Sequence, residues 1–256
     1  MNCPAIPLLL LPGLMNDHRI WTPLVSVVAG ERHVHIAPTH LHDSVAESAR
    51  DAIAAMPPGS FAVAGFSLGG YVAQEVCRQS SDRIAGLGLV DTGARADTDE
   101  ARQARQRMID AVEGGAGGGD ATFSQVAHGF ASRIVHASRL QDRELLQLLS
   151  DMASNVGSEG LVRQQRAAMN RADSRDLLRR LHMPAVVVCG RDDRVTPFSL
   201  SQEMATLLPD AELAAADAAG HMSILEQPAT VVAALVRWLR RVDAAAAGPG
   251  AMSTTI

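Results

Sequence analysis

One serine in the chain has the surroundings of a nucleophile. Ser67 lies in "AGFSLGGYVA" (64–73), where an apolar run gives way to a stretch with helical character, and Gly65 and Gly69 flank it two residues away on either side. A serine at a sharp strand-to-helix turn presents its hydroxyl at the edge of a sheet, and the turn requires small neighbours. The pattern predicts a nucleophile; the alternative is a glycine-rich turn whose serine only caps a helix.

A serine hydroxyl is a weak nucleophile at neutral pH and needs a base beside it. Among the nine histidines, His221 stands in "DAAGHMSILEQP" (217–228), after the last apolar run and before the last amphipathic stretch. A loop there lies at the carboxyl edge of a parallel sheet and can reach a serine on a central strand. We therefore expect His221 to be the base; the alternative is a surface loop histidine.

The base in turn needs a carboxylate that orients its ring. "VVVCGRDDRVTP" (186–197) offers the adjacent Asp192 and Asp193 directly after an apolar run. Asp91, at the end of an earlier run, is a third candidate. The residue types alone leave the choice among these three aspartates open.

The elements that must position these residues alternate along the chain. Short apolar runs at 7–11, 33–37, 61–66, 85–91, 185–190 and 211–216 are separated by longer amphipathic stretches, notably 44–56, 69–80, 199–208 and 228–241. Several runs are continuously apolar, which is typical of strands buried on both faces of a parallel sheet. The alternation predicts a doubly wound α/β domain.

One long stretch interrupts this alternation. Residues 93–181 contain no convincing strand and predict a helical insertion, in which "EGGAGGGD" (113–120) is expected to be a flexible joint. We expect a core domain formed by 1–92 and 182–242, a helical cap of 93–181, and a flexible C-terminal tail of 243–256.

Composition narrows the classes of function. The net charge is −5 and all 23 basic residues are arginine, so the chain shows no basic footprint for nucleic acid and has no lysine for Schiff-base or P-loop chemistry. The three cysteines lack metal or redox spacing, and the N-terminal apolar run is too short to span a bilayer. We expect a cytoplasmic monomer or homodimer with no metal, no cofactor and no membrane partner.

Together, the three motifs resemble the α/β-hydrolase family, in which nucleophile, acid and histidine follow in this order. The resemblance covers about 7–91 and 184–241. The family's G-x-x-D-x-x-x-P pattern falls on "GRDDRVTP" and implies Asp193 as the acid, and its G-H-x-x-x-x-E-x-P pattern again implies His221. It further implies a mostly parallel sheet of about six strands that lacks the family's N-terminal hairpin.

Two backbone N–H groups are expected to hold the oxyanion. Leu68 follows the serine at the start of the predicted helix, and the resemblance implies Leu14 as the second donor. Family members commonly have His-Gly where this chain has Pro12-Gly13, so the support of that loop is an open question.

The resemblance implies a serine hydrolase that acts on a small carboxylic ester. An enol-lactonase or another lactone hydrolase is the alternative, because 86–109 resembles the enol-lactonases; a C–C hydrolase or perhydrolase could use the same triad. Non-catalytic members of the family often lack a triad residue, whereas this chain has all three.

Candidate substrate contacts are Trp21, Phe130, Met152 and Met222, with Ile134 and Met169 as further candidates in the cap. Core packing is the alternative for the cap residues and for Trp21.

Overall fold

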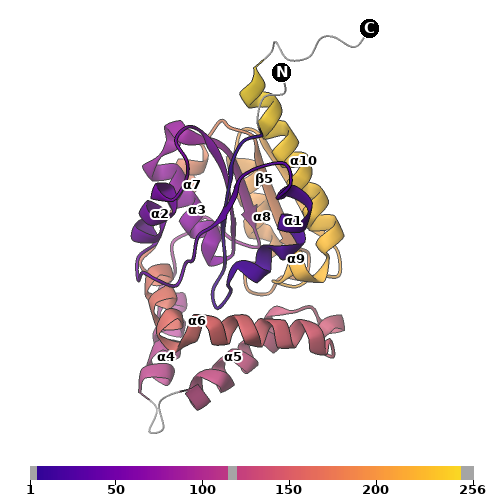
Figure 1. Ribbon diagram of the computed structural model, residues 1–256. Helices are drawn as coiled ribbons and strands as arrows, with labels where there is room; N and C mark the ends of the chain where they lie inside the picture. Colours follow the sequence, from indigo (N-terminus) through magenta and orange to yellow (C-terminus); the bar gives the residue numbers. More distant parts are fainter. Residues whose placement is uncertain (1–4, 115–119, 249–256) are drawn as a thin grey trace.

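Six parallel strands form one sheet at the centre of the molecule (Figure 1). The computed structural model describes residues 5–114 and 120–248. The strands are β1 (Leu8–Leu11), β2 (Val34–Ile36), β3 (Phe61–Phe66), β4 (Ile84–Val90), β5 (Ala185–Gly190) and β6 (Ala211–Ala216). Their order in the sheet is β2-β1-β3-β4-β5-β6, so the strand order reverses beside β1. The predicted parallel α/β sheet of six strands is confirmed.

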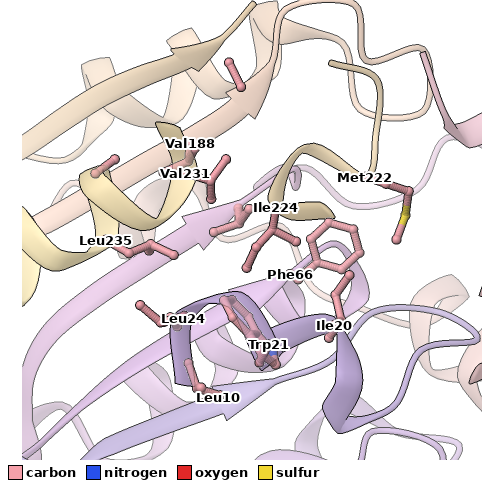
Figure 2. Packing of buried hydrophobic residues seen from close by; sticks show 14 of the residues in the cluster. Leu10, Ile20, Trp21, Leu24, Phe66, Val188, Met222, Ile224, Val231 and Leu235 are labelled. Carbon is pink, nitrogen blue, oxygen red and sulfur yellow. The ribbon is translucent and has the colours of Figure 1, made fainter. Parts of the chain in front are cut away.

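Helices cover both faces of the sheet. Because successive side chains of a strand point to opposite sides, each strand contributes to a hydrophobic cluster on either face. In β1, Leu8 and Leu10 pack into one hydrophobic cluster, whereas Leu9 and Leu11 pack into another. Helices α1 (Thr22–Val28) and α10 (Pro228–Ala247) cover the first face. Helices α2 (Val45–Ala54), α3 (Leu68–Gln79) and α8 (Phe198–Leu207) cover the second. Figure 2 shows the first cluster, where side chains of α1 and α10 meet those of the strands.

Short helical turns complete the core. They are η1 (His18–Trp21), η2 (Ser81–Arg83), α7 (Arg175–Leu178) and α9 (Ser223–Glu226). The structure shows no helix, within the ranges it describes, that is long and apolar enough to cross a membrane.

A helical cap is inserted between β4 and β5. It consists of α4 (Asp99–Glu113), α5 (Asp120–Ile134), η3 (Ala137–Arg139) and α6 (Arg143–Met169), which lie together below the sheet in Figure 1. Helix α6 is broken at Gly157, where φ is 73° and ψ is 172°. The cap helices form a small hydrophobic cluster with Met15 of the core; it includes Ile109, Phe123 and Leu161. Most of the predicted glycine-rich joint (residues 115–119) lies outside the described residues.

Two predicted boundaries differ from the structure. Helix α10 continues to Ala247, so residues 243–247 of the predicted tail are helical. Alanine is the best helix former, and Asp243 is ion-paired with Arg32 at 2.8 Å, which fixes this last part of the helix to the core. Helix α7, placed by the sequence in the cap, contacts α3 and α8 and buries Leu178 in the core.

Candidate active site

Ser67 occupies the turn between β3 and α3. Its φ of 52° and ψ of −115° lie in a region that residues other than glycine rarely adopt. Its backbone N–H donates to the carbonyl of Val90 at 2.9 Å, which ties the turn to β4. The crossing is tight: a Cβ atom on Gly69 would lie only 2.0 Å from the carbonyl oxygen of Leu11. The glycine therefore allows α3 to start directly behind the end of β1.

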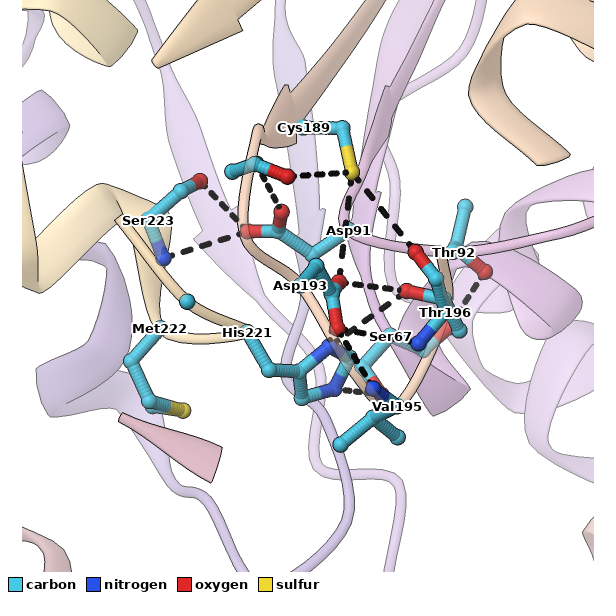
Figure 3. Close-up of polar contacts among 12 residues, drawn as sticks. Ser67, Asp91, Thr92, Cys189, Asp193, Val195, Thr196, His221, Met222 and Ser223 are labelled. Atoms are coloured by element: carbon cyan, nitrogen blue, oxygen red, sulfur yellow. Dashed lines mark hydrogen bonds and ion pairs between the residues drawn. The ribbon is translucent and has the colours of Figure 1, made fainter. Parts of the chain in front are cut away.

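The structure brings Ser67, His221 and Asp193 together in a line of hydrogen bonds (Figure 3). The Ser67 hydroxyl lies 2.9 Å from Nε2 of His221, and Nδ1 of the same ring lies 2.8 Å from Oδ2 of Asp193. The histidine and the aspartate are buried, and the serine is half-buried. Because an ionised carboxylate can only accept, Nδ1 carries the proton and Nε2 is free to accept one from the serine.

Among the three candidate aspartates, only Asp193 is hydrogen-bonded to His221. Its Oδ1 accepts the N–H groups of Val195 and Thr196 at 2.8 and 2.9 Å, and its Oδ2 also accepts the Thr196 hydroxyl at 2.7 Å. The side chain of Asp192 is 53% exposed and lies 3.6 Å from His136 instead. The sequence did not single out Thr196, although a threonine three residues after an aspartate is a common turn partner.

Electrostatics set the protonation of this pair. Burial alone lowers the pKa of His221, but the negative charge of Asp193 and its hydrogen bond outweigh burial and raise that pKa above its ordinary value. Burial pushes the pKa of Asp193 upward, but the His221 charge and the hydrogen bonds from His221 and Thr196 leave it lowered. At neutral pH the arrangement therefore favours an ionised Asp193 next to a histidine that readily accepts a proton.

Asp91 is a second carboxyl group close by. It is completely buried at the end of β4, with a φ of 45°, and accepts the Gly190 N–H at 2.8 Å and the Ser223 hydroxyl at 2.5 Å. Burial and the neighbouring charge of Asp193 raise the pKa of Asp91 to about 8. Asp91 thus links the ends of β4 and β5 to the segment after His221 rather than orienting the imidazole directly.

The two predicted oxyanion donors, Leu14 and Leu68, line the same cavity as Ser67 and His221. Leu68 is the first residue of α3, a position whose N–H has no acceptor within its own helix. In the described part of the chain, neither of the two N–H groups has a hydrogen-bond acceptor. Both are thus free to receive a bound oxygen atom.

A cavity of about 260 Å³ opens over Ser67 between the sheet edge and the cap. Three of the predicted contacts, Phe130, Ile134 and Met222, line it. The other candidates do not. Trp21 and Met152 are fully buried in the main core, and Met169 packs against the hydrophobic cluster of the cap. These three residues therefore pack the interior and do not line the cavity. Lining residues that the sequence did not suggest include Asn16, Tyr71, Arg105 and Val195.

Sequence comparison agrees with this geometry. A model of the alpha/beta hydrolase family matches residues 8–235. The chain belongs to the alpha/beta hydrolase family. It is 31% identical over 195 residues to a pimeloyl-acyl-carrier-protein methyl ester esterase from Chromobacterium violaceum, a match that covers 76% of each protein.

Two solved structures resemble this hydrolase over nearly its whole length. A thermophilic esterase from Thermogutta terrifontis, solved with malate bound, has a TM-score of 0.80 and 28% identity, with 93% of this chain and 90% of the esterase covered. An enol-lactonase from Burkholderia xenovorans also has a TM-score of 0.80, at 20% identity and 92% coverage of both chains. The second likeness reflects the shared fold.

The loop around Leu14 is held by a residue of the cap. Gln164 of α6 is fully buried; its Oε1 accepts the Met15 N–H at 2.9 Å and its amide donates to the Gly13 carbonyl at 3.2 Å. The same amide donates to the hydroxyl of Thr39, which itself donates to the Pro12 carbonyl. These contacts answer how this hydrolase supports a loop without the family's histidine. No local pattern marks Gln164, because its partners are about 150 residues away.

The loop that carries His221 is held in a similar way. Its backbone N–H donates to the carbonyl of Ile134, the last residue of α5, at 2.7 Å. Glu226 accepts the N–H groups of Gly220 and Met222 with one oxygen, and that of His136 with the other. The cap of this hydrolase therefore contacts both the loop that carries His221, the expected base, and the loop of the expected oxyanion donor.

One group of side chains near the site has metal-ligand types. Ligand atoms of Asp91, Cys189 and Asp193 lie within 4.8 Å of one another. Burial, reinforced by the charge of Asp91, raises the pKa of the Cys189 thiol, which keeps it protonated. The carboxylate oxygens already accept hydrogen bonds from backbone, hydroxyl and imidazole groups. A metal ion would have to displace these donors, so the donor set fits a hydrogen-bond network rather than a metal centre.

Proposed function

We propose that this chain hydrolyses a small carboxylic ester through an acyl-enzyme on Ser67. The observation that carries the proposal is the line of hydrogen bonds from Ser67 through His221 to Asp193, at distances of 2.9 and 2.8 Å, with Ser67 and His221 lining a cavity. The esterases among its relatives support an ester as the substrate.

In the first half-reaction, Nε2 of His221 takes the hydroxyl proton of Ser67 while the serine oxygen attacks the ester carbonyl carbon. The carbonyl oxygen becomes an oxyanion and accepts hydrogen bonds from the N–H groups of Leu14 and Leu68. As the intermediate collapses, His221 gives its proton to the leaving alkoxide. The products of this half-reaction are the free alcohol and the acyl-serine.

In the second half-reaction, a water molecule repeats the attack. His221 takes one proton of the water, whose oxygen bonds to the acyl carbon, and then returns that proton to the Ser67 oxygen as the acid leaves. Asp193 remains ionised throughout and stabilises the imidazolium that forms twice in each cycle. The whole cycle uses only groups of this chain and water.

We further propose that the cap (93–181) sets the size of the substrate, while the core, 1–92 and 182–242 with the rest of α10, supplies the reacting groups. Apolar side chains of both parts wall the cavity, including Leu14, Met108, Phe130 and Met222. A cavity of about 260 Å³ suits a short or medium acyl chain rather than a long one.

A lactone is the second candidate substrate. The same attack opens a ring without releasing a separate alcohol, and residues 86–109 resemble the enol-lactonases in sequence. A carbon–carbon bond hydrolase or a perhydrolase would use the same three residues, but no feature of the site favours either.

The test compares p-nitrophenyl esters from acetate to octanoate with several lactones, using the parent protein and Ser67→Ala. We expect turnover to fall beyond medium chain lengths, and Ser67→Ala to lower kcat by about 10,000-fold or more. A fluorophosphonate should label the parent at Ser67, as seen by peptide mass spectrometry. Undiminished turnover in Ser67→Ala would overturn the proposal, and turnover confined to lactones would favour the second candidate.

A further inference from the structure

The cap side of the cavity carries a fixed positive charge. Arg105 of α4 is the one arginine among the described residues that line the cavity, and none of them is an aspartate or glutamate. The rest of the wall is largely apolar, with Met108 and Phe130 on the same side. A substrate bound over Ser67 therefore meets one cationic group in surroundings of low polarity.

Two buried partners hold the Arg105 guanidinium in place. Its Nε donates to Oδ2 of Asp97 at 2.7 Å and its Nη1 donates to Oε1 of Gln165 at 2.8 Å. Both partners are buried. These bonds use two of the five N–H groups of a guanidinium, and the described residues offer no acceptor to the other three. The arginine is thus positioned with hydrogen-bonding capacity to spare.

Asp97 does not neutralise this site, because it is shared. Its Oδ1 lies 2.5 Å from Nη1 of Arg171, whose guanidinium also lies 4.0 Å from the ring centre of Tyr71, another lining residue. One carboxylate between two arginines leaves the trio with a net charge of +1. Charges that are partly shielded from water interact strongly, so an anion in the cavity would be stabilised.

We propose that Arg105 forms an anion subsite in the cap, so that the preferred substrates are esters or lactones that carry a second, free carboxylate. This inference rests on the proposed function of Ser67. A guanidinium presents paired N–H groups in a planar fork that matches a carboxylate. The largely apolar lining that Ser67 and Arg105 share suits a methylene chain that joins the ester to the free carboxylate.

The first test uses monomethyl esters of straight-chain dicarboxylic acids of four to seven carbons. Each is compared with its monoamide, which has the same shape without the charge. We expect the parent to prefer the acid by tenfold or more in kcat/KM, chiefly through KM, at one of these lengths. Arg105→Gln should remove this preference and Arg105→Lys should keep part of it, because the charge remains.

The matched control is Arg107→Gln, since Arg107 is exposed on the same helix and does not line the cavity. It should keep the preference of the parent. Thermal melting of each variant checks that the cap is folded. A parent that treats acid and amide alike, or an Arg105→Gln variant that loses rate equally on both, would overturn the anion subsite.

A second test does not depend on turnover. Calorimetry on Ser67→Ala with the free dicarboxylic acids should show binding that weakens tenfold or more when Arg105→Gln is added. If the parent cleaves no ester but the acids bind through Arg105, the subsite stands and the proposed function fails. If esters are cleaved without any effect of Arg105, the function stands and the subsite fails.

Discussion

The two carboxyl groups closest to His221 differ in charge because their surroundings differ. Asp193 accepts hydrogen bonds from two backbone N–H groups, a hydroxyl and the imidazole, and its pKa is lowered. Asp91 is more deeply buried and faces the charge of Asp193, which contributes to a pKa of about 8. At pH 7 one negative charge therefore lies next to the histidine, and the second carboxyl is mostly neutral.

The raised pKa of His221 predicts the pH profile. The base must be neutral to accept the serine proton, so kcat/KM should fall as the pH drops through that pKa, with a midpoint above 6.5. Asp193→Asn removes the charge that raises the pKa, so the midpoint should move to lower pH and kcat should fall by about 10,000-fold. Asp192→Asn is the control and should change neither. An unchanged midpoint in Asp193→Asn would contradict this account.

Gln164 should act as a positioning residue for the oxyanion loop. Gln164→Met removes the hydrogen bonds to Met15 and Gly13 on either side of Leu14, so the Leu14 N–H loses its fixed direction. We expect kcat to fall by about 10- to 100-fold, because small displacements of a catalytic group have effects of this size. KM should change little, which separates this role from a loss of the substrate pocket.

The control for Gln164 lies on the same helix. Gln147 is exposed on α6 and bonds only to Asp151 among the described residues, so Gln147→Met should leave kcat unchanged. Gln164→Glu keeps an acceptor for the Met15 N–H and should retain more activity than Gln164→Met. Equal kcat values in the parent and Gln164→Met would show that the loop holds its shape without the cap.

At the scale of elements, the crossing of α3 behind β1 is one of the tightest junctions near the site. Gly69→Ala would place a methyl group against the Leu11 carbonyl, so we expect a loss of about 3 kcal/mol or more in the free energy of unfolding, with loss of activity. Gly129→Ala, in α5, meets no neighbour within 4 Å and should be neutral or stabilising by up to about 1 kcal/mol. Urea unfolding measures both; similar stabilities for the two variants would contradict the prediction.

The four inner strands, β1, β3, β4 and β5, could be predicted from the sequence because each is a short apolar run that is almost wholly buried, a signal that is local. The edge strands β2 and β6 are only partly buried and were marked mainly by their place in the alternation of strands and helices. Ser67, His221 and the alternatives for the acid could be proposed from the sequence because each follows a strand at the carboxyl edge. In the sequence, only the resemblance to a family pattern favours Asp193 over Asp192, whereas in the structure the hydroxyl and N–H of Thr196 donate to Asp193.

Contacts between distant segments could not be predicted. Gln164 and Arg105 look like ordinary polar residues of amphipathic helices, and only the fold brings one to the Leu14 loop and the other to the cavity. Trp21 and Met152 had the right residue types for a pocket, but the direction of a side chain depends on how its helix is rotated. Sequence periodicity does not determine that rotation when both sides of a helix are partly apolar.

At the scale of the whole molecule, Asp91 should make stability depend on pH. Its pKa is about 8 in the folded state against 3.8 ordinarily, so between these values the folded protein holds a proton that the unfolded chain releases. The free energy of unfolding should therefore fall as the pH rises, with Asp91 contributing up to about 1.4 kcal/mol per pH unit.

Asp91→Asn should remove this contribution and make the dependence flatter. Urea unfolding of both proteins at pH 5, 6, 7 and 8 gives the two slopes. Groups that titrate in both proteins contribute to both curves, so the difference between the slopes isolates Asp91. Parallel curves would mean that Asp91 is already ionised in the folded protein.

The hydrogen bonds that the Met15 N–H donates to Gln164 and the His221 N–H donates to Ile134 have a consequence for recombination among relatives. A chimaera that takes its cap from another family member replaces at once the partners of the two loops that carry His221 and Leu14, the expected base and oxyanion donor. Such an exchange would change the reaction rate as well as the substrate range, unless the donor cap supplies an equivalent amide and carbonyl. In this protein, substrate choice and catalytic rate are thus expected to evolve together rather than separately.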